Sequence, residues 1–419
     1  MTLFKSLTHR LFALLLGGQT TSRLGDSLFR ITLAWWVLEK THSAAAMGTV
    51  LIFSSVPMLL FLLIGGVATD RFPRLRIMLL SDVFNGIVVA VITLLAFLGW
   101  LEVWHIYIAS VLFGLVSAFF HPAYTATVPE ITPKELLPSA NSLTSLFQRG
   151  TSIIGPAIGA SIVAFGGTPL AFGLDALSFV ISAVCIVLIL SSHPELNVAP
   201  KPPTPVDGQA STSPAKAGMR TAFKDLREGY LAVIASPWLW ITIVIFGFVN
   251  ASSSPMSVSL PFLIKNNLHA DVAVLGLFTS MSAVGFVVGA VFIGSFKVIR
   301  RRGPLAYIST ITFGAAIGIF GVTVSIPLLA AAAFVEGFFI SIFGLIWTNS
   351  LQELVPRELL GRVSSIDALG SFVLLPIGFG ISGWATDLIG APLVFIIGGS
   401  LTVILALVGL SNRSVRSLD

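Results

Sequence analysis

The chain has 419 residues, of which 55% are hydrophobic and only 10% are charged. Because a soluble domain carries roughly 25% charged residues, this composition excludes a water-soluble fold and indicates a protein with many membrane spans. The net charge is +5, but the basic residues gather in short loops between apolar runs, as in membrane proteins. This placement predicts no nucleic-acid partner. The single cysteine, Cys185, lies inside an apolar run and excludes a disulfide framework or a thiolate metal site.

Twelve apolar runs reach the ~20 residues that cross a bilayer. They predict an all-α membrane protein with two six-helix bundles, residues 1–191 and 238–419, joined by a cytoplasmic linker at 192–237. The expected spans of the first bundle are 11–38, 46–69, 75–99, 104–126, 141–166 and 169–191, and those of the second are 238–263, 273–297, 304–323, 326–349, 365–388 and 390–410.

The linker is rich in Pro, Ser and Thr from about 192 to 219, a composition typical of disorder. After it, Phe223, Leu226, Tyr230 and Val233 recur at helical spacing. This pattern predicts an amphipathic helix on the cytoplasmic interface, the alternative being an extension of the seventh span.

The positions of Lys and Arg predict the orientation. With a cytoplasmic amino terminus, Lys40 and Lys265 lie outside, Arg23, Arg30 and Arg149 lie within spans, and all the other basic residues are cytoplasmic. Basic residues favour cytoplasmic loops, so both termini are expected in the cytoplasm of a multi-pass protein of the cell membrane. The amino-terminal run is interpreted as the first span and not as a cleaved signal.

The two halves repeat at an offset of 223 residues. Residues 130–137 match 353–360, Gly66 falls on Gly289, and Gly155 falls on Gly378. Parallel repeats of six helices are a transporter architecture, with substrate bound between the halves near mid-membrane.

Between the second and third spans, the pattern Gly66-x-x-x-Asp70-Arg71-x-x-Arg74-x-Arg76 resembles the signature of the major facilitator superfamily. The chain departs from it at Pro73, where the family usually has glycine. In the second half Ile293 and Gly294 stand where the Asp-Arg pair would be, so we expect a weaker latch there.

The resemblance implies that Asp70 contacts the start of the eleventh span, near 364–367, and holds the cytoplasmic side closed. The residues expected in this gate are Gly66, Asp70, Arg71, Arg74, Arg76, Glu130 and Asp367. Glu130 is the expected partner of the arginines, and Thr132 to Glu135 has the sequence of a capping box with proline at the first helical position.

On the fifth span, Gly155, Pro156 and Gly159 resemble the antiporter motif of drug and metabolite exporters, although Ala160 stands where a second glycine is common. Proline kinks a helix, and small residues let a neighbouring helix come close. Ordinary close packing is the alternative. Residues 23–30 and 172–179 resemble the branch of macrolide-efflux and siderophore exporters, whose members are proton-driven.

Charges inside spans are functional-site hypotheses, because each costs at least ~2.5–3.5 kcal/mol at mid-bilayer. Gln19, Arg23, Asp26 and Arg30 are spaced to share one face of the first span. Asp26 is a candidate for proton coupling. The two arginines should hold it ionised, which leaves a fixed ion pair or a substrate contact as alternatives.

Glu336 lies near the middle of the tenth span with no basic residue on its own helix. Burial away from a basic partner favours the protonated form that a proton carrier needs, so Glu336 is the second coupling candidate. A permanently protonated glutamic acid bonded to a neighbouring helix is the alternative.

The other intramembrane charges have simpler explanations. Asp82, Asp175 and Asp367 are expected to make helix-terminal or interhelical hydrogen bonds, and His121 is expected to be packed. Arg149 is expected to snorkel to the cytoplasmic end of its span, or to meet an anionic substrate.

The seventh span turns polar at the depth of Asp26, which points to a central cavity shared by both halves. The residues expected to line it are Gln19, Arg23, Arg30, Asn250, Ser253 and Trp347.

The sequence therefore predicts a proton-coupled exporter of amphipathic small molecules, such as drugs or siderophores, working by alternating access. Its partners are the lipid bilayer, a small-molecule substrate and protons, with no nucleic acid, and it is expected to be monomeric. No P-loop and no metal-ligand spacing is present, so we expect no enzymatic activity, cofactor or metal. The alternatives are a proton-coupled importer, an uncoupled facilitator, or a non-transporting protein such as a lipid scramblase or a sensor.

Overall fold

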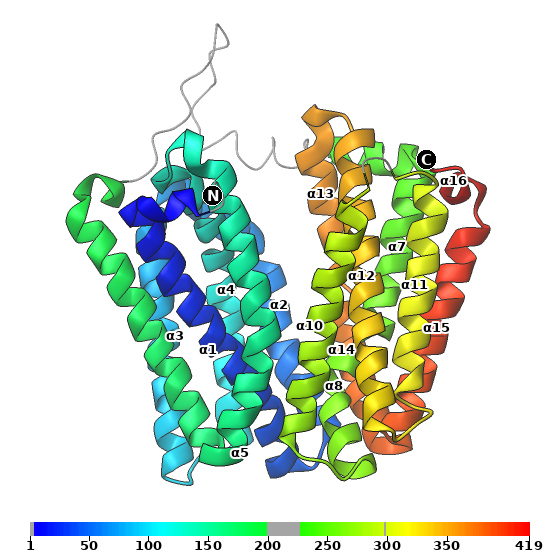
Figure 1. Ribbon diagram of the computed structural model, residues 1–419, viewed down its shortest axis with the longest axis horizontal. Coiled ribbons are helices and arrows are strands. Elements are labelled where there is room, and N and C mark those ends of the chain that lie inside the picture. The colour runs from blue at the N-terminus through cyan, green and yellow to red at the C-terminus, as the bar shows by residue number, and fades with distance from the viewer. Residues whose placement is uncertain (1–3, 199–226, 297–298) are drawn as a thin grey trace, which may run out of the picture. The chain divides into compact units, whose positions relative to one another are not determined.

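The computed structural model describes residues 4–198, 227–296 and 299–419, and none of these residues forms a β-strand. Long helices account for nearly all of the described chain (Figure 1). The helices of membrane length, with the short helices that continue them, are α1 (Arg10–Thr41), α2 (Ala44–Arg71), α3 (Arg74–Phe97), α4 (Val103–Ile131), α5 (Leu137–Ser192), α7 (Pro237–Ser252), α8 (Pro255–Val258), α9 (Leu260–Phe262), η4 (Leu263–Asn267), α10 (Val272–Gly294), α11 (Arg302–Ile319), α12 (Ile326–Leu354), α13 (Arg357–Phe372), α14 (Leu375–Ile389) and α15 (Ala391–Ser411).

The chain forms two compact units. The first contains residues 1–200 with the segments 258–283 and 379–391, and the second contains 201–257, 284–378 and 392–419. In the first unit, α1 packs on α5, α2 on α4, and α3 on both α4 and α5. In the second unit, α11 packs on α12 and α13 on α7. The expected division at a 192–237 linker stays a prediction.

α5 is two spans joined at a glycine. Its backbone departs from helical geometry at Gly167, where φ is +75° and ψ is 172°. This conformation is strained for any residue with a Cβ, so a glycine is required at the turn. Each part of α5 is long enough to cross the bilayer, which gives the first half of the chain its six expected spans.

Two spans of the second half are interrupted. The seventh span breaks after α7 at Ser253 and Ser254 and resumes at Pro255, and the eleventh breaks between α13 and α14. Asn250 Nδ2 donates a 2.8 Å hydrogen bond to the carbonyl of Ser371, one of the last carbonyls of α13. The terminal carbonyls of a helix have no partner within it, so the amide of Asn250 satisfies one of the groups left by the second break.

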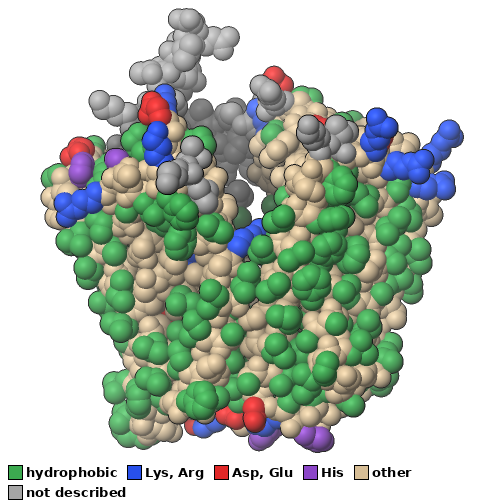
Figure 2. All heavy atoms as spheres, viewed as in Figure 1, with side chains coloured by type: hydrophobic (Ala, Val, Ile, Leu, Met, Phe, Trp, Pro, Cys, Tyr) green, Lys and Arg blue, Asp and Glu red, His purple; other side chains and the backbone are tan. Residues whose placement is uncertain are grey.

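Nine stretches of the described residues are long and apolar enough to span a membrane. One of them contains both parts of α5, and α1 and α11 complete a set consistent with twelve spans. Figure 2 shows hydrophobic side chains covering the middle of the helices in each unit, with charged side chains towards their ends. The all-α, multi-pass membrane fold predicted from composition is confirmed.

The internal repeat is visible in the packing of two equivalent glycines. A Cβ at Gly155 would lie 2.5 Å from Ser27 Cβ on α1, and a Cβ at Gly378 would lie 2.6 Å from Ala251 Cα on α7. Residues 155 and 378 are equivalent at the offset of 223, and each lets the fifth helix of its repeat come close to the first.

The predictions for the connecting segments are wrong in one place and lie partly outside the described residues in two others. The capping box is wrong: Lys134–Leu136 is a short 3-10 helix without a side-chain cap, and the buried Thr132 hydroxyl has no hydrogen-bond partner among the described residues. The first residues of the expected interfacial helix, 223–226, lie outside the described residues, and the rest of it, within 227–235, is helical. The linker prediction falls largely on undescribed residues, except that Pro194–Asn197 forms a short 3-10 helix.

Candidate functional site

The first unit contains a cavity of about 390 Å³ whose walls are partly apolar and carry many polar side chains. Its polar lining comes from α1 to α5 and consists of Gln19, Ser22, Arg23, Asp26, Arg30, Ser54, Ser55, Asp82, Asn85, Ser110, Ser117, His121 and Asp175. α1 supplies five of these side chains. Most of them are three or four residues apart, and such residues lie on one face of a helix. The predicted polar face of the first span is confirmed as a cavity wall.

Three carboxylates from three different helices meet in this cavity. Asp26 lies on α1, Asp82 on α3, and Asp175 on the second part of α5. Asp82 and Asp175 are each only 1% exposed. Asp82 makes the interhelical hydrogen bond expected of it, whereas Asp175 bonds to Ser178 on its own helix. Both also belong to the site of Asp26, which the sequence had not indicated. The only signal in the sequence was the presence of a carboxylate within a membrane-length run.

A short hydrogen-bond chain holds Asp82. Gln19 Nε2 donates to Ser182 Oγ at 2.9 Å, and Ser182 Oγ donates to Asp82 Oδ2 at 2.6 Å. This chain runs from α1 through α5 to α3 and lies in the core, since Gln19 is 2% exposed and Ser182 is fully buried. A buried carboxylate is stable only with such partners, so Gln19 and Ser182 fix the position of Asp82.

Asp175 is brought to α1 by a glycine. A Cβ at Gly25 would overlap both Asp175 Oδ1 and Ser178 Oγ. Ser178 Oγ donates to the Asp175 carbonyl at 2.7 Å and lies 3.3 Å from its carboxylate. Gly25 therefore allows the close approach that puts Asp175 beside Asp26.

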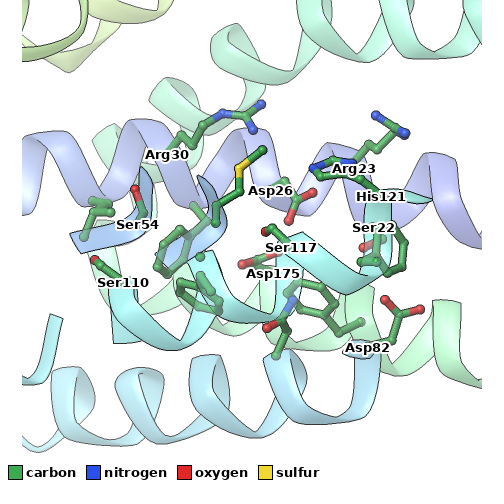
Figure 3. Close-up of a pocket in the computed structure, with 18 of the residues that line it drawn as sticks. Ser22, Arg23, Asp26, Arg30, Ser54, Asp82, Ser110, Ser117, His121 and Asp175 are labelled. Carbon is green, nitrogen blue, oxygen red and sulfur yellow. The ribbon is translucent and has the colours of Figure 1, made fainter. Parts of the chain in front are cut away.

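The guanidinium groups of Arg23 and Arg30 point away from the Asp26 carboxylate, although the three residues share one face of α1. Figure 3 shows the Asp26 carboxylate directed towards Asp175 and Ser117, while the guanidinium groups of Arg23 and Arg30 extend the other way. Arg23 lies over the ring of Tyr124, 5.3 Å from its centroid, and Arg30 donates to Ser27 Oγ at 3.1 Å. Two arginines therefore flank Asp26 along the helix, as expected, but their guanidinium groups point away from its carboxylate.

The packed histidine expected at position 121 is a wrong prediction. His121 is exposed and lines the cavity next to Arg23 (Figure 3). Helical periodicity placed it near the end of its span but could not show that this face of α4 borders a hollow.

The site candidates of the second half are engaged within their own unit. Ser253 Oγ donates to the Asn250 carbonyl at 3.1 Å, and Trp347 Nε1 donates to Asp367 Oδ2 at 3.0 Å. Glu336 is half-buried on α12. Their roles in a substrate cavity or in proton coupling stay predictions.

The charged stretch after α2 contains one confirmed pair. Arg74, the first residue of α3, donates to Glu130 Oε2 near the end of α4 at 3.1 Å. Gly66 borders open space, and it is the neighbouring Gly65 whose Cβ would overlap the Ala118 carbonyl. The contact expected between Asp70 and the eleventh span stays a prediction.

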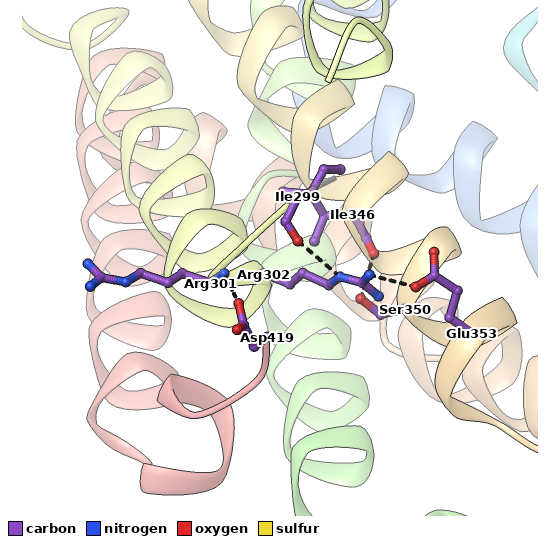
Figure 4. Close-up of polar contacts among 7 residues, drawn as sticks. All are labelled: Ile299, Arg301, Arg302, Ile346, Ser350, Glu353 and Asp419. Atoms are coloured by element: carbon purple, nitrogen blue, oxygen red, sulfur yellow. Dashed lines mark hydrogen bonds and ion pairs between the residues drawn. The ribbon is translucent and has the colours of Figure 1, made fainter. Parts of the chain in front are cut away.

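The second repeat keeps an equivalent pair. Arg302, the first residue of α11, donates to Glu353 Oε2 near the end of α12 at 2.5 Å (Figure 4). Glu353 is the repeat equivalent of Glu130. The second copy therefore lacks the Asp-Arg pair but retains the pairing of arginine with glutamate. The weaker latch expected in the second half stays a prediction.

Within the described part of the chain, no group of three or more His, Cys, Asp or Glu side chains is arranged to hold a metal ion.

The family comparison decides the class. Residues 1–408 match the family model described as transmembrane secretion effector. The chain belongs to this family of major facilitator transporters. Transmembrane secretion effectors of this type are transport proteins and not enzymes.

Two relatives of this transmembrane secretion effector are efflux proteins. Macrolide efflux protein A of Streptococcus pyogenes is 22% identical over 404 residues, which cover 96% of each chain. The enterobactin exporter EntS of Citrobacter koseri is 26% identical over 407 residues, covering 93% of this chain and 92% of the relative. The resemblance to the macrolide-efflux and siderophore-exporter branch is confirmed.

Solved structures share the fold. The nucleoside transporter NupG matches with a TM-score of 0.75 at 12% identity, covering 96% of this chain and 99% of that one. A bacterial homologue of the iron transporter ferroportin matches with a TM-score of 0.71 at 15% identity, with the same two coverages. At these identities the likeness establishes the fold alone.

Proposed function

We propose that this transmembrane secretion effector exports amphipathic small molecules in exchange for protons, by alternating access. The observation that carries the proposal is the meeting of Asp26, Asp82 and Asp175 in one cavity. Carboxylates in a poorly solvated site compete for protons and repel one another when ionised, so occupancy of the site by substrate can be tied to release of a proton.

The direction of transport rests on the relatives, which are named as efflux and exporter proteins. The amphipathic character of the substrate rests on the lining of the cavity, where Phe29, Met58 and Phe113 lie beside the charged groups. Apolar walls with a few polar groups are typical of sites that bind drug-sized ligands.

The test uses the purified full-length protein in liposomes with an imposed pH gradient and a panel of lipophilic drugs and siderophores. We expect accumulation that follows the gradient and collapses when a protonophore is added. We also expect Asp26→Asn and Asp82→Asn to lose at least about tenfold of the gradient-driven rate, since a removed intramembrane carboxylate cannot bind the coupling proton.

Asp271→Asn is the matched control, because Asp271 is exposed and lies outside the cavity. This variant should transport as the unmodified protein does. Accumulation of a substrate that ignores the pH gradient would contradict the coupling, and unaltered coupling in both cavity variants would exclude these carboxylates.

We further propose that the chain lies in the cell membrane as a monomer with both termini in the cytoplasm. The support is the bias of basic residues towards one set of loops. In a Cys185→Ser background, an impermeant maleimide should label Trp100→Cys but not Ser417→Cys in intact cells. The reverse pattern would overturn the orientation, and light scattering of the purified protein checks the monomer.

A further inference from the structure

A second pocket, of about 220 Å³, lies between α1 and the first part of α5. It shares Arg23, Asp26 and Arg30 with the larger cavity and adds Arg149 from α5. Its lining is almost wholly polar and carries three arginines against one carboxylate.

The arginines of this pocket are at least partly exposed. Arg30 and Arg149 are exposed although they lie in spans, and Arg23 is half-buried. An arginine held against hydrocarbon near mid-membrane is strongly unfavourable, so this face of α1 and α5 must border an aqueous path. A charged ligand could reach the pocket through water.

Asp26 does not neutralise its two neighbours by direct contact. Neither Arg23 nor Arg30 forms an ion pair within 4.0 Å among the described residues, and the Asp26 carboxylate points away from both guanidinium groups (Figure 3). The buried Nε of Arg23 has no hydrogen-bond partner in the described structure. This Nε of Arg23 is a donor available to an oxyanion that enters the pocket, and the neighbouring guanidinium groups add positive charge.

We propose that Arg23, Arg30 and Arg149 form the subsite for an anionic group of the exported molecule, such as a carboxylate, phosphate or sulfonate. The apolar body of the same molecule then lies in the adjoining cavity beside Phe29 and Phe113. The inference rests on the proposed export function and narrows its substrate class to amphipathic anions.

The pocket adjoins the cavity that contains the carboxylates, since the two share Arg23, Asp26 and Arg30 as lining residues. A lipid headgroup would satisfy the same three arginines, but it would leave the adjoining cavity without an occupant. We therefore assign the subsite to a transported anion, and the experiment distinguishes a transported anion from a lipid headgroup.

The test measures equilibrium binding to the full-length protein in detergent with neutral lipid. The probes are 1-pyrenebutyrate and the pyrenebutyl-trimethylammonium cation, which share one fluorescent body and carry opposite charges. We expect the anion to bind at least about tenfold more tightly than the cation, and its affinity to fall as salt is added.

Replacing one arginine removes one charge-assisted contact, so Arg23→Gln, Arg30→Gln and Arg149→Gln should each weaken binding of the anion about tenfold. Arg10→Gln is the matched control, because Arg10 is exposed at the start of α1 and outside both pockets. Binding of the cation should change little or improve in the three pocket variants.

Equal binding of the two probes, or anion binding that all three variants leave unchanged, overturns the inference. Loss of anion binding on adding phosphatidylglycerol, with no transport of the anion, assigns the pocket to a lipid headgroup and also overturns it. Neither result touches proton coupling, which is measured by transport. Conversely, selective anion binding without any response to a pH gradient would leave this subsite intact and remove the proposed coupling.

Discussion

The contact between α1 and the second part of α5 depends on Gly25. Because a Cβ at this position would overlap the side chains of Asp175 and Ser178, Gly25→Ala must push the helices apart. Overpacking of this kind destabilises by about 1–3 kcal/mol. We expect a lower melting temperature in detergent and a loss of transport, as Asp175 moves away from Asp26.

Gly17 is a matched control on the same helix. A Cβ there meets nothing within 4 Å, so Gly17→Ala should be neutral, or stabilise by up to about 1 kcal/mol through helix propensity. If the two alanine variants melt at the same temperature, the close approach at Gly25 is not required.

The sequence could predict α1's contribution to the site but not that of the other helices. Gln19, Arg23, Asp26 and Arg30 share a face by spacing alone, and all four line the cavity. Asp82 and its partner Ser182 are separated by 100 residues. Periodicity describes one helix at a time, so it cannot show which residues of separate helices meet.

At the scale of elements, each repeat braces its third and fourth spans with an ion pair. Arg74 joins α3 to α4 through Glu130, and Arg302 joins α11 to α12 through Glu353. The arginine side chains are 23% and 14% exposed and the glutamate side chains 27% and 57%, so both pairs are partly solvated. The two braces should therefore be of similar strength.

Double-mutant cycles can compare the braces. We expect both cycles, with glutamine in place of each partner, to give a coupling of up to about 1 kcal/mol, as found for partly exposed pairs. Melting temperatures of the single and double variants in detergent supply the measurement. A coupling in the first half with none in the second would show that only the first repeat is stabilised by its ion pair.

The alignment of the repeats explains why the second brace was not predicted. Glu130 and Glu353 are equivalent at the offset of 223, but Arg74 falls on Lys297, five residues before Arg302. A longer turn between α10 and α11 shifts the arginine along the chain while α11 still begins with it. The twelve spans could be predicted because the length and hydropathy of a run depend only on neighbouring residues. The helix breaks at Ser253 and Gly167 could not, because they depend on backbone geometry.

At the scale of the whole molecule, the anion subsite and the proton sites together determine the net charge that crosses the membrane in each exchange. Export of one monovalent anion against entry of one proton carries the equivalent of two positive charges inwards. Each elementary charge is worth about 2.3 kcal/mol per 100 mV, so a potential negative on the cytoplasmic side adds about 4.6 kcal/mol per 100 mV to each exchange.

Transport of 1-pyrenebutyrate in liposomes should therefore respond to a potassium diffusion potential set with valinomycin, even when the pH is equal on both sides. Exchange of the matching pyrenebutyl-trimethylammonium cation for one proton would move no net charge, so any transport of it should ignore the potential. Arg149→Gln should slow anion transport at every potential without removing the dependence on potential, since it weakens binding but leaves the stoichiometry unchanged. Anion transport that is insensitive to the potential would contradict the exchange of one anion for one proton, because an exchange that moves two charges cannot be electrically silent.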